Sequence, residues 1–518
     1  MLTMFIVSLN STVVAPAMSI IATDLDNALG EQTWIATAFI VAMNSVQCIS
    51  GKLSDIFGRK PLLIFGLSFF LIGSVINGTA PNINALIAGR TLQGLGSGNI
   101  MAMLFVVVVD ITPLKWRPRM QALLIIVYGV SSTIGPIVGG AFVDKLTWRW
   151  IFWLNLILGG AALIITFILL PETAPVKKES MFTKIKRVDF LGILFSISFV
   201  TCILLALSYG PRYGWSDAHS IGPLVAAGVS LIVFIYIEGW VAKEPLMPAA
   251  IMLDRKVFLV YLYLCSLGLG FMGNLYYSPI LFQAVFGANS TESGIRIIPY
   301  MGCLIAGSIV SGVFVKKFPY IKFYIVVGAA SNVLGFGLFY TVNEYSNFGR
   351  QAGFLTFCGL AVGLALQSCV LSVQMVVAKQ HLAVATVLNN FFMFLAGSIA
   401  IAVFQALFIT FSAAQFKGVD PETLAIAQQY GALTNHLNVR NMPIDAQGPI
   451  IHAYMEAIRN VFIIPLVIAG IGFICTIFLS NVRFTITSSE QEGLQQTPGK
   501  KSSNNNSSAT STKTQESV

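Results

Sequence analysis

The sequence predicts an all-α membrane protein with many spans, and three observations lead to this fold class. Of the 518 residues, 56% are hydrophobic and only 10% are charged, and the mean hydropathy is +0.78. Soluble chains carry about 25% charged residues. Apolar runs of about 20 residues, the length that crosses the hydrocarbon layer as a helix, recur along the chain. The runs lack the apolar and polar alternation of barrel strands, so helices are expected.

Fourteen spans are expected. They are predicted at residues 2–22, 33–50, 61–80, 83–109, 120–143, 150–170, 190–209, 220–238, 257–283, 294–315, 322–342, 351–376, 383–411 and 459–480. Two segments are predicted to lie outside the membrane. Residues 412–457 are predicted to form a long outer loop, and residues 484–518 are polar and of low complexity, which predicts a disordered cytoplasmic tail.

Basic residues indicate the orientation of the spans. If both termini are cytoplasmic, the six short inner loops hold eighteen Lys and Arg residues, and the six short outer loops hold five. Because basic residues gather in cytoplasmic loops, both termini are expected in the cytoplasm. This bias also explains the net charge of +9 without a nucleic-acid partner. The seven cysteines lie in apolar segments without metal spacing, so neither a disulfide framework nor a metal site is expected.

A weak internal repeat divides the chain into two halves. The segment SGVFVKKFPYIKF at residues 311–323 follows the tenth span and echoes SGKLSDIFGRKPL at residues 50–62, which follows the second. Parallel halves around a central site are a transporter architecture. The expected domains are an N-terminal six-helix half at 1–170, a linker with two extra transmembrane helices at 171–256, a C-terminal half at 257–483 that includes the outer loop, and the tail.

The segment GKLSDIFGRKP at residues 51–61 places four charges in eleven residues between two apolar runs. Gly51 and Gly58 allow close backbone approach and a turn. Asp55 can pair with the surrounding cations or cap a neighbouring helix. The alternative is a solvated basic loop that serves only to orient the chain.

Arg90 is predicted to lie within a span, in the segment ALIAGRTLQGLGSG at residues 85–98. A charge there costs at least about 2.5–3.5 kcal/mol. Gln93, Gly94, Ser97 and Gly98 follow at helical spacing, so one face of the helix is polar and small. This face suits close packing and an aqueous cavity. The alternative is an arginine that snorkels to the outer headgroups.

These segments resemble signatures of the major facilitator superfamily. The loop at 51–61, the span-four segment at 85–98 and GVSSTIGPIVGG at 129–140 are similar to three of its motifs. TWRWIFWLN at 147–155, PLMPAAIM at 245–252 and YYSPILFQAVFGANSTESGIRIIP at 276–299 are similar to its fourteen-span drug:proton antiporter branch, especially to fungal members. The resemblance implies a major facilitator fold.

The resemblance also implies two functional elements. The first is a latch that closes the halves on the cytoplasmic side when the cavity faces outward. The second is an antiporter motif associated with export, although ordinary helix packing also explains its glycines, and its proline invites a kink. The latch would comprise Gly51, Asp55, Gly58 and Arg59, with Arg117 or Arg119 as partners, and the antiporter motif Gly129, Gly135, Pro136, Gly139 and Gly140.

Polar groups within the spans are candidates for the cavity and for coupling, and interhelical hydrogen bonding explains any single one equally well. The family usually has an acidic residue where this chain has Asn10, which cannot titrate. Asp110 ends an apolar run and is the remaining coupling candidate. The cavity and coupling candidates are Asn10, Arg90, Gln93, Asp110, Gln283, Gln367 and Asn389, within a wider polar set that adds Gln47, Asn274, Tyr276, Tyr277, Gln374 and Asn390.

The resemblance implies a secondary transporter that exports small organic compounds, drugs or toxins, by alternating access. The alternatives are a vacuolar transporter of basic amino acids and a non-transporting nutrient sensor. The sequence has no nucleotide-binding motif and no catalytic His, Cys and carboxylate constellation, so no enzyme is expected. The expected partners are the bilayer, a small-molecule substrate and, where coupling exists, protons. We expect a monomer without a cofactor, in the plasma membrane or alternatively in the vacuolar membrane.

Overall fold

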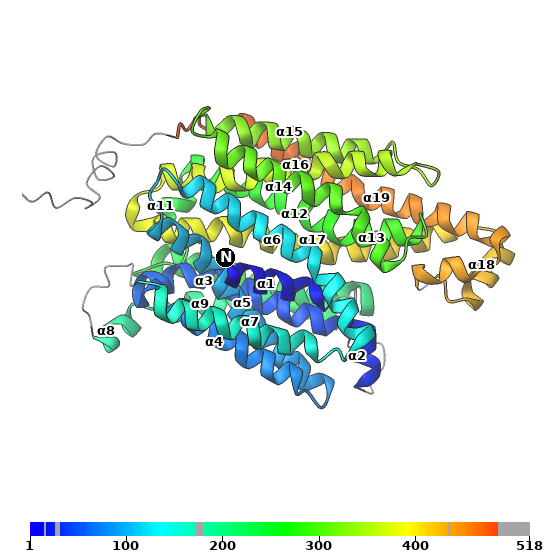
Figure 1. The fold of residues 1–518 in the computed structure, drawn as a ribbon, viewed down its shortest axis with the longest axis horizontal. Helices are drawn as coiled ribbons and strands as arrows, with labels where there is room; N and C mark the ends of the chain where they lie inside the picture. The colour runs from blue at the N-terminus through cyan, green and yellow to red at the C-terminus, as the bar shows by residue number, and fades with distance from the viewer. Residues whose placement is uncertain (15–16, 26–31, 172–179, 434, 485–518) are drawn as a thin grey trace, which may run out of the picture. The chain divides into compact units, whose positions relative to one another are not determined.

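The computed structural model describes residues 1–484 apart from 15–16, 26–31, 172–179 and 434 (Figure 1). The predicted tail lies outside the described residues except for its first residue. Every named element in the described part is a helix. The all-α class is thus confirmed.

The helices follow the predicted spans closely. The N-terminal helices are α1 (Leu2–Val13), α2 (Met18–Asp24), α3 (Gln32–Phe57), α4 (Arg59–Gly78), α5 (Ile83–Ile111), α6 (Arg117–Lys145) and α7 (Trp150–Leu169). The linking segment contains α8 (Met181–Lys186), α9 (Phe190–Tyr213), α10 (Ala218–Tyr236), a π-helical turn (Ile237–Val241) and α11 (Ala249–Met252). The C-terminal helices are α12 (Arg255–Ala284), α13 (Ser290–Arg296), α14 (Ile298–Phe314), α15 (Ile321–Phe339), α16 (Phe348–Val376), α17 (Leu382–Phe416), α18 (Pro421–Gln429) and α19 (Ile444–Ile477), with 3₁₀ turns at Lys379–His381 and His436–Asn441.

Thirteen helices in the described residues are long and apolar enough to cross a membrane. The first predicted span, at 2–22, corresponds to α1 and α2 on either side of residues 15–16, and the twelve residues of α1 are fewer than the about 20 that a span needs. The predicted outer loop at 412–457 is wrong as a loop. It contains the end of α17, all of α18 and the first part of α19, which begins fifteen residues before the predicted span.

Several helices begin at side chains that cap their first turn. Asn82 accepts a hydrogen bond from the amide of Ala85 at the start of α5, and Asp189 accepts one from Gly192 at the start of α9. Asp254 and Asn347 do the same for α12 and α16. A short polar acceptor before an apolar run satisfies donors that the helix leaves open, which explains why the predicted and observed starts agree.

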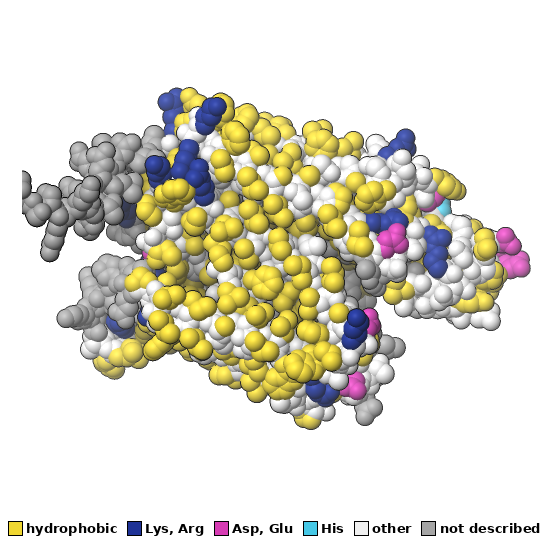
Figure 2. All heavy atoms as spheres, viewed as in Figure 1, with side chains coloured by type: hydrophobic (Ala, Val, Ile, Leu, Met, Phe, Trp, Pro, Cys, Tyr) yellow, Lys and Arg dark blue, Asp and Glu magenta, His cyan; other side chains and the backbone are white. Residues whose placement is uncertain are grey.

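The surface of the bundle matches a bilayer. Figure 2 shows hydrophobic side chains across the middle of one face and charged side chains at its two ends. Helix α7 illustrates the pattern, since Phe167, Ile168 and Leu169 are 66%, 68% and 72% exposed. Large apolar side chains exposed this densely have lipid as their solvent. The protein is therefore a multi-pass integral membrane protein.

Two symmetric helix contacts join the two halves. Helix α3 packs against α17, and α6 packs against α14. Under the internal repeat, α3 corresponds to α14 and α6 to α17, so the two contacts are copies of one another. The extra helix α9 packs on its neighbour α10 and also on α3 and α17, which belong to different halves. We call the end of the bundle with the loops at 58, 112–116 and 315–320 the basic end.

Candidate functional site

Two small cavities lie between the halves. Their volumes are about 20 Å³ and 40 Å³. Tyr128 of α6 and Phe394 of α17 line both cavities, and their ring centroids are 6.2 Å apart. A site that holds a drug-sized ligand needs about 300–1,000 Å³. The described state is therefore closed around its central space.

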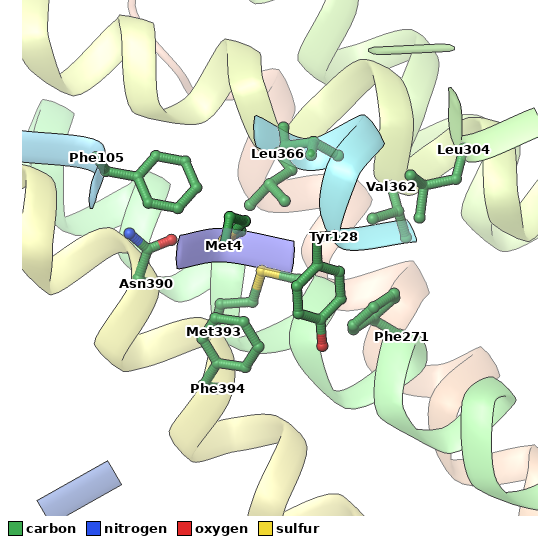
Figure 3. Close-up of a pocket in the computed structure, with 11 residues that line it drawn as sticks. Met4, Phe105, Tyr128, Phe271, Leu304, Val362, Leu366, Asn390, Met393 and Phe394 are labelled. Carbon is green, nitrogen blue, oxygen red and sulfur yellow. The ribbon is translucent and has the colours of Figure 1, made fainter. Parts of the chain in front are cut away.

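Every side chain that lines the two cavities is uncharged. The second cavity is lined by rings and thioethers such as Phe39, Met43 and Tyr276, with the hydroxyls of Thr12 and Ser398. The first is more apolar (Figure 3), and it is lined by Met4, Phe105, Ile125, Tyr128, Phe271, Leu304, Val362, Leu366, Asn390, Met393 and Phe394. Apart from Tyr276, these rings and methionines were not among the residues predicted from the sequence. In sequence they look like any other member of an apolar run.

Asn390 is the side-chain amide that lines the first cavity. Its side chain is 2% exposed, and its Nδ2 atom is buried without a hydrogen-bond partner among the described residues. Figure 3 shows the amide directed toward Met4 and Phe105. A buried amide without a partner costs about 1–3 kcal/mol, so a molecule that enters the cavity and bonds this group removes that penalty.

Arg90 is fully buried within the N-terminal half, which overturns the snorkelling alternative. Its side chain is 1% exposed, Nε donates to the carbonyl of Ile35 at 3.0 Å, and Nη1 donates to Oε1 of Gln93 at 2.8 Å. The guanidinium carbon also lies 4.3 Å from the ring centroid of Phe39. Since Phe39 lines the second cavity, the charge stands behind the cavity wall.

Two residues that sequence reasoning missed complete the Arg90 cluster. Gln93 donates to Oγ of Ser74 at 2.8 Å and accepts from Nδ2 of Asn77 at 3.2 Å. Ser74 and Asn77 lie on α4, so the cluster holds α3, α4 and α5 together. Gln93 thus binds helices within one half and does not line either cavity.

Asn10 forms a buried amide pair with Asn155 of α7. Asn155 Nδ2 donates to Asn10 Oδ1 at 2.9 Å, and both side chains are 0% exposed. The second atom of each amide, Asn10 Nδ2 and Asn155 Oδ1, has no partner among the described residues. The position of the family's usual carboxylate is therefore occupied by an amide contact between α1 and α7.

The predicted latch contains an ion-pair triad within the N-terminal half. Asp55 pairs with Arg59 at 2.6 Å, and Arg59 Nε also contacts Asp110 Oδ2 at 3.1 Å. These residues belong to α3, α4 and α5, and Gly58 between the first two helices has φ of +99°, which only glycine adopts readily. Arg59 rather than Arg117 or Arg119 thus forms the ion pair of Asp55. Arg117 donates to the carbonyl of Thr112, and Arg119 lies over Trp116.

Two hydrogen bonds between uncharged groups join the halves at the basic end. Gln121 of α6 donates to Gln374 of α16 at 3.1 Å, and Gln367 of α16 donates to the carbonyl of Pro118. Gly51 and Gly312 are the repeated glycines of the Ser-Gly pairs. A Cβ on Gly51 would lie 3.2 Å from Val387 Cβ, and a Cβ on Gly312 would lie 2.9 Å from Ala122 Cβ.

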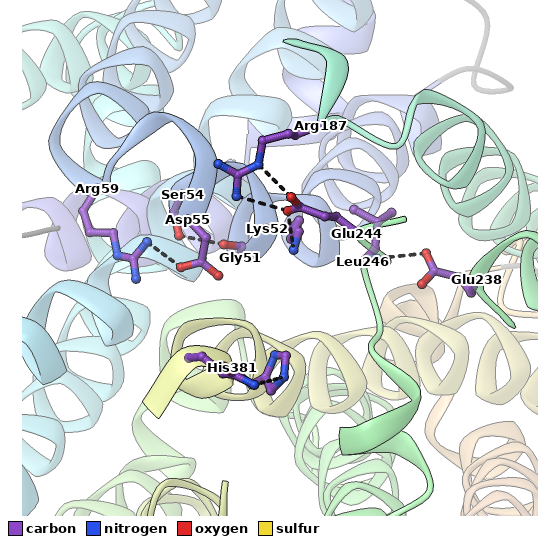
Figure 4. A network of polar contacts seen from close by, with 11 residues as sticks. Gly51, Lys52, Ser54, Asp55, Arg59, Arg187, Glu238, Glu244, Leu246 and His381 are labelled. Atoms are coloured by element: carbon purple, nitrogen blue, oxygen red, sulfur yellow. Dashed lines mark hydrogen bonds and ion pairs between the residues drawn. The ribbon is translucent and has the colours of Figure 1, made fainter. Parts of the chain in front are cut away.

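A second charged cluster ties the linking segment to the segment at residues 51–61 (Figure 4). Lys52 pairs with Glu244 at 2.9 Å, and Arg187 contacts the same carboxylate at 2.7 Å. Burial alone would raise the pKa of Glu244, but its hydrogen bonds with Arg187 and Lys52 leave that pKa below the usual value. Glu238 accepts from the amides of Leu246 and Met247 and holds the PLMPAAIM segment.

The glycines of the antiporter motif face different partners. A Cβ on Gly135 would lie 2.0 Å from Thr12 Oγ1, so α1 touches α6 there, while Gly129 faces Leu304 of the other half at 3.7 Å. Gly139 is buried, and a Cβ on Gly140 would meet no atom within 4 Å. Pro136 lies inside the continuous helix α6.

The remaining predicted cavity residues make structural hydrogen bonds away from the two cavities. Gln283 donates to Ser293 Oγ at 2.9 Å and connects α12 to α13. Asn389 donates to the carbonyl of Ala385 at 3.1 Å. Of the wider polar set, Tyr276 and Asn390 do line the cavities. Spacing along a helix placed these groups inside the bundle correctly but did not distinguish which neighbour each side chain meets.

Comparison with known proteins identifies the family. The sequence profile described as Major Facilitator Superfamily matches residues 1–401. The chain belongs to the major facilitator superfamily. The fold agrees with a human organic anion transporter, MFSD10, with a TM-score of 0.58 and 15% identity over 90% of this chain and 97% of that one. This likeness shows the fold.

Fungal proteins are among the relatives of this major facilitator. An MFS-type transporter of Claviceps purpurea is 31% identical over 92% of this chain and 82% of its own length. A rubrofusarin-specific efflux pump of Gibberella zeae is 30% identical over 90% of this chain and 86% of its own length. The efflux pump aflT of Aspergillus parasiticus is 31% identical over 90% and 91%. These relatives are transporters and efflux pumps.

We expect Arg90→Met to lower transport at least about tenfold while the protein still reaches the membrane. Methionine has a similar length but cannot bond the Ile35 carbonyl or Gln93, and leaving such buried partners open costs about 1–3 kcal/mol. The measurement is substrate flux together with the unfolding temperature of the purified variant. Arg90→Lys keeps the charge but loses the planar guanidinium group, so transport by this variant should also fall. Normal flux in Arg90→Met would mean that the guanidinium is dispensable.

We expect Gly312→Ala to shift the protein away from the state that is closed at the basic end. The added methyl group would meet Ala122 at 2.9 Å, which is too close for the halves to remain in contact. Distances between spin labels on the two halves at this end should lengthen in the variant. Gly302→Ala is the matched control on the same helix, because its Cβ would meet nothing within 4 Å. Equal distance distributions in both variants would contradict a closing role for Gly312.

Proposed function

We propose that the protein is a secondary transporter that exports small organic compounds by alternating access. The observation that carries this proposal is a central space formed by both halves, closed at the basic end by a glutamine hydrogen bond and close glycine contacts. The efflux functions named for the fungal relatives support the direction of transport. We infer further that the protein acts as a monomer in the plasma membrane.

The charge distribution supports a cytoplasmic location for the basic end. Positive residues are retained in cytoplasmic loops, and the short loops at this end hold most of the Lys and Arg residues of the chain. With this orientation, the described state is closed to the cytoplasm. The substrate would then leave toward the opposite side.

The cavity walls support an uncharged substrate. A charged group in a low-dielectric site without a partner carries a large desolvation penalty, and none of the lining side chains is ionic. The only amide without a partner in the first cavity, among the described residues, is Asn390. A ring compound with a carbonyl group would stack on Tyr128 or Phe394 and accept from this amide. The same walls offer no partner for a basic amino acid, the substrate of the vacuolar alternative.

We expect proteoliposomes with this protein to transport fluorenone faster than a fluorenone carboxylate, which is charged. Fluorenone should also be transported faster than fluorene, which has the same shape without the carbonyl. One hydrogen bond contributes about 0.5–1.5 kcal/mol, so the preference for fluorenone over fluorene should be about two- to tenfold. Asn390→Leu should remove this preference and keep the discrimination against charge. Asn389→Leu is the matched neighbour, since Asn389 does not line either cavity. A faster flux of the charged compound would overturn the proposed substrate class.

We propose that any proton coupling passes through the triad at the basic end. Asp55 and Asp110 share the guanidinium of Arg59, so the triad carries one surplus negative charge that a proton would neutralise. Opening of the basic end would change its access to the cytoplasm. Asn10 offers no titrating group and is sealed against Asn155.

We expect an imposed proton gradient to accelerate export by the wild type, and Asp110→Asn to lose that acceleration because the triad becomes neutral. Asn10→Asp adds a second titrating group and should strengthen the dependence on the gradient. The measurement is flux in proteoliposomes with and without the gradient. Gradient-driven export that persists unchanged in Asp110→Asn would show that coupling does not use this triad.

A further inference from the structure

Two cations, one from each half, lie over a single tryptophan at the basic end. The guanidinium carbon of Arg119, on α6, lies 4.9 Å from the ring centroid of Trp116, and Nζ of Lys316, just beyond α14, lies 4.7 Å from it. Lys115 precedes the tryptophan in sequence. We call Lys115, Trp116, Arg119 and Lys316 the Trp116 cluster. Figure 2 shows dark blue side chains gathered at the end of the bundle where α6 begins.

Among the described residues, these cations have no acidic partner. In the part of the chain that the structure describes, no carboxylate forms an ion pair with Lys115, Arg119 or Lys316, and the buried Nε atom of Arg119 has no hydrogen-bond partner. Burial lowers the pKa of Lys316 first, and the charges of Arg119 and Lys115 lower it further.

Two other cations at the same end are paired with carboxylates. Lys52 pairs with Glu244, and Arg59 pairs with Asp55 and Asp110. A basic loop that only orients the chain would not need two cations from different halves on one ring. The Trp116 cluster therefore differs from Lys52 and Arg59 in lacking an acidic partner among the described residues.

The surroundings of the cluster are those of a membrane interface. Trp116 is 42% exposed, and tryptophan is favoured at the level of the headgroups. Below it, exposed apolar side chains continue along both helices, with Leu123 of α6 at 39%, Val313 of α14 at 41% and Phe314 at 46%. A ligand with an anionic head and an apolar chain fits both parts.

We propose that the Trp116 cluster binds the phosphate of an anionic phospholipid headgroup, with an acyl chain along α6 and α14. Basic pockets between transmembrane helices bind such headgroups, and guanidinium and ammonium groups form their strongest hydrogen bonds with phosphate. The cluster draws Arg119 from one half and Lys316 from the other. A bound headgroup therefore relieves their repulsion and stabilises the state that is closed at the basic end.

The chain's own tail is a poorer occupant for the cluster. Residues 485–518 contain three glutamates and three lysines, so the tail has no acidic excess. The apolar side chains below the cations would also remain uncovered by a polar, low-complexity segment. A phospholipid satisfies the charge and the apolar surface together.

The test uses the full chain in nanodiscs of phosphatidylcholine with one fifth phosphatidylserine. Native mass spectrometry measures the fraction of protein that retains phosphatidylserine. Each cation near the surface contributes about a fivefold change in affinity for anionic lipid, so Lys316→Gln and Arg119→Gln should each lower the retained fraction about fivefold. The matched control is Lys60→Gln, which removes the same charge from a cation that lies over Phe167, 5.7 Å from its centroid, at the same end.

Each outcome of this test is decisive. Retention that falls only in the Trp116 cluster variants, with shorter distances between the halves at the basic end in phosphatidylserine than in pure phosphatidylcholine, supports the proposal. An equal fall in Lys60→Gln would reduce the effect to net charge and overturn it. In detergent without lipid, inorganic phosphate is the second probe. If it stabilises the wild type but not Lys316→Gln in detergent, and also displaces phosphatidylserine from the nanodisc sample, the ligand is a soluble phosphate and the lipid proposal fails.

Discussion

The architecture depends on the close approach of two helix pairs at the basic end. Gly51 brings α3 against α17, and Gly312 brings α14 against α6, each at a distance that leaves no room for a Cβ without a shift. Because the two glycines are equivalent in the internal repeat, the interface is closed twice by the same device. Close backbone contact makes this seal sensitive to a single methyl group. It is also uncharged, so it opens without separating ion pairs in a dry interface.

In this arrangement, the charged triad does not act as a latch between the halves. Asp55, Arg59 and Asp110 lie on three helices of one half, so their ion pairs hold that half together while the halves part. Arg90 does the same deeper in the bundle, where it joins α3, α4 and α5. Charges that rigidify one half can remain in place through the cycle, and the desolvation of a buried ion need not be repeated.

The sequence predicted the fold better than the site, for a physical reason. Apolar length and capping residues such as Asn82 determine where helices lie, and both are local properties of the chain. The cavity is built by residues from distant segments, and its walls are aromatic and thioether groups such as Phe394 and Met393, which look in sequence like any lipid-facing residue. Polar residues were easier to notice, but Gln93 and Asn10 bond a neighbouring helix of the same half and do not line a cavity. Asn390 was in the wider polar set, and its place in the wall of the first cavity distinguishes it from its neighbour Asn389.

The two extra helices constrain how the halves can move. Helix α9 packs on α3 and on α17, which belong to different halves. At the basic end, the linking segment is fastened to the first half by Lys52, Glu244 and Arg187. Its contact with α17 has no such ion pair among the described residues. The linking segment is thus expected to travel with the first half and to slide over α17, so that α9 covers the α3 and α17 seam from the lipid throughout the cycle. The Gly312 seam has no such cover from α9, and it is there that the Trp116 cluster lies open to lipid.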